Sequence, residues 1–153
     1  MRFLLGSIIL LVGIILWQFI NADWMPSYGI ANFIDIPSML SILLVLVGVI
    51  VITNGGKDFL AGMRIAFGKT SNSKEELESA ITLFELLQKV IIYTGLIAFL
   101  VALIQIANNY IDTYYMDILT SNFAIALLPV YYSLIGLVFL SSIVSVLKKR
   151  AKK

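Results

Sequence analysis

The sequence predicts an all-α integral membrane protein with four transmembrane helices, both termini cytoplasmic, and a short amphipathic cytosolic helical segment. Three observations predict this fold. The 153-residue chain is 60% hydrophobic and only 13% charged, with a mean hydropathy of +0.98, far from the balance of a soluble domain. Its apolar residues gather into four long runs. All 11 basic residues fall on one side of the membrane when those runs are treated as spans.

The first two spans are predicted at residues 3–20 and 37–54. Residues 3–20 carry no charge, and a helix of 18 residues is about 27 Å long, just enough to cross the hydrocarbon core. A signal peptide is the alternative for this run, but the run is long for that role and the residues after it make a poor cleavage site. The second span has Asp35 at its outer edge and is ended by Gly55 and Gly56.

The third and fourth spans are predicted at residues 90–107 and 122–147. The third contains one amide, Gln105, and the fourth contains Pro129 and is long enough to tilt or to emerge from the bilayer. None of the four spans contains an Asp, Glu, Lys, Arg or His residue. Proton and ion relays across a bilayer normally need such a group, so a carboxylate for that purpose is expected to come from a partner chain.

The basic residues give the orientation. They lie at the N-terminus, in the segment between the second and third spans, and in the C-terminal tail. The other two loops, 21–38 and 108–122, hold four Asp residues and no Lys or Arg. Positive charge stays on the cytoplasmic side of a membrane, so both termini are predicted to be cytoplasmic and residues 1–153 to form a single membrane domain.

The cytosolic segment 57–89 is predicted to be helical in two parts. Ser73 and Glu76 have the spacing of a capping box, which opens a helix at Lys74 that continues without a breaker into the third span. In the earlier part, four apolar side chains fall on one helical face: Phe59, Leu60, Met63 and Phe67. That face predicts either an interfacial helix lying on the membrane or a collar that packs against neighbouring subunits.

Several function classes fail on residue types. The chain has no Cys and no His, which removes disulfides, thiolate or imidazole metal sites and the usual nucleophile–base pairs. It also lacks a glycine-rich phosphate loop following a strand. The basic residues are separated by long apolar runs, unlike those of a nucleic-acid-binding surface. We therefore expect no enzyme activity, no cofactor, no metal and no nucleic-acid partner.

Three short stretches carry a family resemblance: Phe33-Ile34-Asp35-Ile36-Pro37-Ser38, then Gly95 to Asn109, then Phe123 to Tyr132. Together they resemble the second, third and fourth spans of MotA-type stator subunits in the MotA/TolQ/ExbB proton-channel family. The resemblance covers residues 29–69 and 83–147. It implies a homo-oligomer, five copies in the known members, in the bacterial inner membrane. That ring would surround a single-span MotB-like partner, which carries the essential Asp, and would couple ion flow to mechanical work such as flagellar rotation.

The departures from the family favour an alternative, a non-conducting four-span membrane scaffold or accessory protein. Only a short segment replaces the large cytosolic domain that engages the flagellar rotor. Apolar residues stand where the family has pore threonines, which makes the candidate path drier. The positions that the resemblance places facing the partner or lining the pore are Ala98, Phe99, Ala102, Gln105, Pro129, Val130 and Ser133.

Overall fold

A computed structural model describes residues 34–68, 73–109 and 116–152, together with Gly6, Ile8, Ile9 and Val12. The predicted first span, 3–20, otherwise lies outside the described residues, as does most of the loop that follows it. Over the three continuous ranges the chain is helical and contains no strand. The helices are α2 (Ile36–Ile52), α3 (Gly56–Ala66), α4 (Lys74–Asn109) and α5 (Met116–Ala151).

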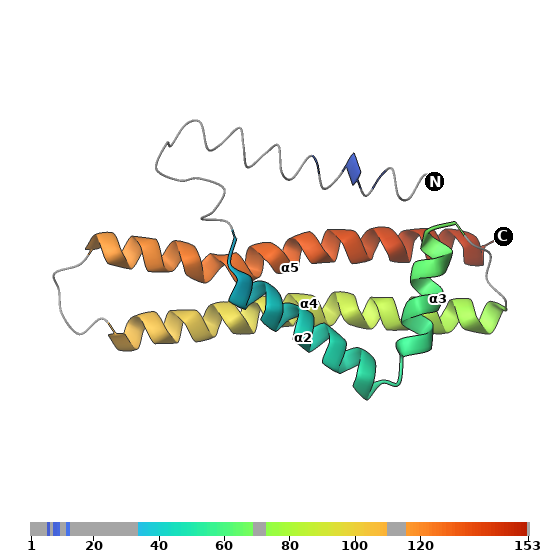
Figure 1. The fold of residues 1–153 in the computed structure, drawn as a ribbon, viewed down its shortest axis with the longest axis horizontal. Coiled ribbons are helices and arrows are strands. Elements are labelled where there is room, and N and C mark those ends of the chain that lie inside the picture. The colour runs from blue at the N-terminus through green and yellow to red at the C-terminus, as the bar shows by residue number, and fades with distance from the viewer. Residues whose placement is uncertain are drawn as a thin grey trace.

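Helices α4 and α5 form a long antiparallel hairpin and lie side by side along most of their length (Figure 1). Each has 36 residues, so each is about 54 Å long, well beyond the thickness of a hydrocarbon core. The predicted helix from Lys74 through the third span is confirmed, and the backbone N–H of Glu76 donates to Ser73 Oγ at 3.1 Å. Pro129 lies inside α5 without ending it.

The predicted break at the two glycines is also confirmed. Helix α2 ends at Ile52, Asn54 adopts a left-handed φ of 52°, and α3 begins at Gly56 with its axis bent by 114° from that of α2. A Cβ on Gly55 would lie 3.0 Å from both methyl carbons of Leu83, so a side chain there would press on α4. Among the described residues, two helices, α4 and α5, are long and apolar enough to cross a membrane, and the bent α2–α3 pair makes a third if it is one span.

The best-packed part of the molecule is the end of the hairpin where α3 lies across α4 and α5 (Figure 1). We call this the inner core. Its buried side chains are Ile65, Ala66, Leu77, Ala80, Leu83, Phe84, Leu87, Leu140, Ile143, Val144 and Leu147. Two ion pairs flank it, Arg64 with Glu76 and Lys148 with Glu85, each at 2.6 Å. Nonpolar packing and charge pairing together hold the beginning of α4 to the end of α5.

Helix α3 is most deeply buried along the face that carries its small residues. Its buried residues are Ala61, Gly62, Ile65 and Ala66, and Gly62 lies directly against the ring of Phe84. Small side chains allow α3 to approach α4 closely, which explains why this face is chosen. Of the predicted apolar face, Phe59 and Met63 pack at the edge of the inner core, whereas Leu60 and Phe67 are exposed. The four predicted residues thus divide between packing within this subunit and exposure on its surface.

Candidate functional site

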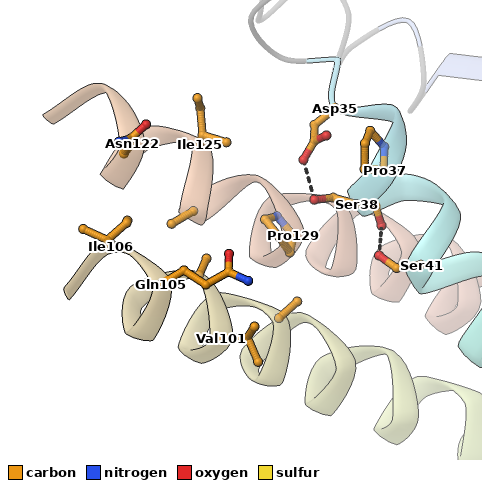
Figure 2. Close-up of a pocket in the computed structure, with 13 residues that line it drawn as sticks. Asp35, Pro37, Ser38, Ser41, Val101, Gln105, Ile106, Asn122, Ile125 and Pro129 are labelled. Atoms are coloured by element: carbon orange, nitrogen blue, oxygen red, sulfur yellow. Dashed lines mark hydrogen bonds between the residues drawn. The ribbon is translucent and has the colours of Figure 1, made fainter. Parts of the chain in front are cut away.

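A groove opens between the first turns of α2 and the halves of α4 and α5 that lie farthest from the inner core (Figure 2). We call it the polar groove. Its volume is about 680 Å³. It is lined by Asp35, Pro37, Ser38 and Ser41 before and within α2, by Ala98, Val101, Ala102, Gln105 and Ile106 of α4, and by Asn122, Ile125, Ala126 and Pro129 of α5.

Asp35 stands immediately before α2 in an extended conformation, with φ −113° and ψ 94°. Pro37 in the first turn suits a helix start because its missing N–H has no helical partner there. The Asp35 carboxylate accepts a hydrogen bond from the hydroxyl of Ser38, and Ser41 Oγ donates to the carbonyl of Ser38 at 3.0 Å. One carboxylate and two hydroxyl groups thus lie on the α2 side of the polar groove.

A long-range hydrogen bond fixes where along α5 this acidic residue lies. The backbone N–H of Asp35 donates to Tyr132 Oη at 2.7 Å, joining positions 97 residues apart. Tyr132 is ten residues along α5 from Asn122, or about 15 Å. The sequence analysis places Asp35 at the outer edge of the second span. In the structure it does begin α2, but it lies level with the interior of the predicted fourth span and not with that span's start.

The structure separates the seven predicted pore or partner positions into two groups. Ala98, Ala102, Gln105 and Pro129 all line the polar groove. The other three positions are not among its lining residues.

Those three positions take part in helix packing. The ring of Phe99 packs edge-on against that of Phe123, with centroids 6.2 Å apart. Val130 is half-buried. Ser133 is only 2% exposed, and its hydroxyl lies against Gly95 at the α4–α5 contact with no hydrogen-bond partner among the described residues. Ser133 is thus turned toward α4 within one subunit.

Sequence reasoning missed the α2 side of the groove. Asp35, Ser38 and Ser41 recur every three residues, a spacing that puts them along one side of a helix. This pattern was available in the sequence, as was Asn122 at the start of the predicted fourth span. What the sequence lacks is the Tyr132 contact, which brings that polar side against α5.

The groove combines one carboxylate with hydroxyl and amide groups set in apolar walls. No Lys or Arg is among its lining residues, so its fixed formal charge is negative. The described part of the chain contains no group of three or more His, Cys, Asp or Glu residues that could hold a metal ion. The arrangement therefore suits water and weakly held cations more than a tightly coordinated metal.

Comparison with protein-family models, curated proteins and solved structures finds no match to this chain.

Proposed function

We propose that this chain is a compact MotA-like ion-channel subunit of a bacterial inner membrane. It has four spans with both termini cytoplasmic. A homo-oligomeric ring, of five copies in the family it resembles, surrounds a single-span MotB-like partner that supplies the proton-binding Asp. The ring couples ion flow to mechanical work. The observation that carries this proposal is the polar groove, which gathers Ala98, Ala102, Gln105 and Pro129 beside Asp35.

The outward faces of the hairpin favour assembly with other helices. Tyr93, Ile97, Leu100 and Ile104 form an exposed stripe on α4, which we call the α4 seam. Their spacing of four, three and four residues is that of a helix–helix packing seam. In the most apolar 18-residue stretches of α4 and α5, only 11% and 28% of residues, respectively, are buried within the subunit. Lipid alone can cover such faces, and a ring would cover part of them with neighbouring subunits.

The charge distribution favours one orientation. The described basic residues lie in α3, in the first part of α4, and in or just after the last turn of α5, all toward the end of the hairpin that holds the inner core. With that end in the cytoplasm, the polar groove lies in the outer half of the hairpin. The long extension of the hairpin then projects from the inner membrane surface and carries α3 as a collar.

Native mass spectrometry on complexes extracted gently from their own membrane tests the assembly. The expected result is about five copies of this chain with one or two single-span partners. A monomer, a dimer, or a complex with a soluble protein alone would contradict the ring.

A charge introduced into the groove tests which surface faces the partner. We expect Ala102→Asp to abolish partner capture or ion flux, because an uncompensated carboxylate would be placed against the partner's own acid. Ala124→Asp is the control, since Ala124 is exposed on α5 at the same end of the hairpin but does not line the groove. Equal assembly and flux in both variants would count against a partner-facing role for Ala102.

One observation favours the second candidate function, a non-conducting membrane scaffold or accessory protein. Beyond Ser41, the α2 side chains that reach the inner core are all apolar: Ile42, Leu46, Val49 and Ile50. No polar path continues inward along them. Under this alternative the collar formed by α3 and the start of α4 binds another protein. Proton flux into liposomes containing the purified complex separates the two functions.

A further inference from the structure

We infer that the polar groove is a water-filled vestibule that takes up hydrated monovalent cations from the outer side, with Asp35 as the charge that selects them. The inference relies on the orientation in the proposed function and adds to that function the ligand class of the groove. It assigns to this chain a carboxylate of its own, in addition to any acid that a partner supplies.

The position of Asp35 is held by its backbone, which leaves its side chain available. The bond to Tyr132 uses the backbone N–H, and the carboxylate accepts from Ser38. A carboxylate has two oxygens with about four acceptor positions, so most of that capacity remains for water or a cation. Asp35 is only half-buried, which is consistent with contact to the groove.

The opposite wall offers further polar groups. Gln105 of α4 and Asn122 of α5 lie across the groove from Asp35 and Ser38 (Figure 2). A volume of about 680 Å³ has room for on the order of twenty water molecules. A cation in the groove could therefore keep most of its hydration shell while lying near one negative charge.

The single carboxylate sets the class of cation. Calcium usually takes six to eight oxygen ligands, often from several carboxylates, and magnesium requires near-ideal octahedral geometry. The groove lining contains one carboxylate and no other charged side chain. Its apolar walls lower the local dielectric, which strengthens the attraction of cations and the repulsion of anions. A monovalent cation, hydronium included, fits this field without a built coordination shell.

The inner end of the groove is closed within the subunit. Ile42, one residue beyond Ser41, is 5% exposed and belongs to the continuous apolar cluster that ends in the inner core. A cation reaching Asp35 can therefore leave only sideways, toward a neighbouring helix, or back to the outer side. This makes the groove a vestibule and not a complete pore.

Single-cysteine labelling tests the vestibule directly, because the natural chain contains no cysteine and gives no background. The variant Ser41→Cys, in full-length chain in membrane vesicles of known orientation, is treated with two thiosulfonates of similar size. One is cationic, trimethylammonium-ethyl, and one is anionic, sulfonato-ethyl. Each rate is divided by the same reagent's rate with a free thiol in solution. The control is Leu43→Cys, 54% exposed on the other side of α2 and absent from the groove lining.

We expect Ser41→Cys to react from the outer side, with a corrected cation-over-anion rate ratio of at least fivefold. Adding Asp35→Asn should lower that ratio to near one while Ser41→Cys still reacts. Leu43→Cys should be at least tenfold slower with both reagents, because a thiol in lipid stays protonated and dry. Unchanged thermal unfolding of the Asp35→Asn variant confirms that the fold persists.

Three outcomes would overturn the inference: no reaction at Ser41→Cys, reaction only from the inner side, or a corrected ratio near one with Asp35 intact. The labelling needs neither a ring nor a partner. A cation preference in the labelling, with no ring found by mass spectrometry, would support the vestibule and contradict the proposed channel assembly. A ring with no cation preference would support the assembly and contradict the vestibule.

Discussion

The two ends of the α4–α5 hairpin are built on different principles. At the inner core, three helices bury a continuous apolar cluster, close packing is achieved with glycine and alanine on α3, and ion pairs join the helices at the rim. At the outer end most apolar side chains of the same two helices are exposed and a polar groove separates them from α2. In the proposed orientation, one subunit would therefore be self-sufficient at its cytoplasmic end and incomplete within the membrane.

In the proposed orientation, this difference follows from the solvent at each end. In water, burial of apolar surface drives helix association, at roughly 25 cal/mol per Å². In lipid that driving force is absent, and helices associate through close packing of small residues and hydrogen bonds. The outer half has both in small number: the Gly95–Ser133 approach and the bond from Asp35 to Tyr132. Stability should therefore be concentrated at the inner core and assembly capacity in the outer half.

The largest effect is expected at the centre of the inner core. Phe84 is fully buried, stacks on Phe59 with centroids 5.5 Å apart, and lies against Gly62. Phe84→Ala should lower the free energy of unfolding by about 3–5 kcal/mol, because it removes a large buried side chain and leaves a cavity. Denaturant titration of the protein in detergent, followed by circular dichroism, measures this change.

Phe123→Ala is the matched control for that variant, since Phe123 is 46% exposed at the outer end. Phe123→Ala should lower the free energy of unfolding by less than half as much as Phe84→Ala does. Equal costs at the two positions would contradict the division between a self-sufficient inner end and an incomplete outer end.

The next effect is expected at a close approach of α4 and α5, where Gly95 meets Ser133. A Cβ on Gly95 would clash with the side chain of Ser133 and lie 3.1 Å from the carbonyl oxygen of Pro129. Gly95→Val should destabilise the hairpin by about 1–3 kcal/mol through overpacking. Gly48→Val is the control, because a Cβ on Gly48 meets nothing within 4 Å.

The size of that effect measures how much the subunit's own α4–α5 contact stabilises the outer half. Both variants should be assayed by the same denaturant titration, with oligomer state measured in parallel. A loss for Gly48→Val as large as that for Gly95→Val would show that the subunit's own α4–α5 contact is not what limits packing there.

The sequence predicts local features of both ends and misses the contacts between distant segments. The start of α4 could be predicted because the Ser73–Glu76 interaction spans three residues, and the end of α2 because two glycines break it. The docking face of α3 could not, since its choice depends on Phe84 of another helix. The level of Asp35 along α5 could not be predicted either, because it is set by the contact with Tyr132, 97 residues away.

A smaller effect is expected where α2 is attached to α5. Tyr132→Phe removes the hydroxyl that accepts the Asp35 N–H and should cost about 1 kcal/mol. We expect faster hydrogen exchange in the first turn of α2 and unchanged exchange around Leu83 and Phe84. Mass spectrometry of exchanged peptides makes the measurement. Faster exchange spread evenly over both regions would mean that the two ends are coupled and do not open separately.

The smallest effect is expected at the rim of the inner core. Lys148 and Glu85 pair at 2.6 Å, but their side chains are 55% and 42% exposed, so water and salt screen the attraction. Lys148→Gln should lower the free energy of unfolding by under about 1 kcal/mol, with the loss shrinking at high salt. Arg64→Gln should cost more, because Arg64 and Glu76 are less exposed, at 36% and 22%, so water and salt screen their attraction less. Equal, salt-independent losses at the two pairs would mean that charge contributes no more at the half-buried pair than at the exposed one, leaving apolar packing alone to hold the inner end together.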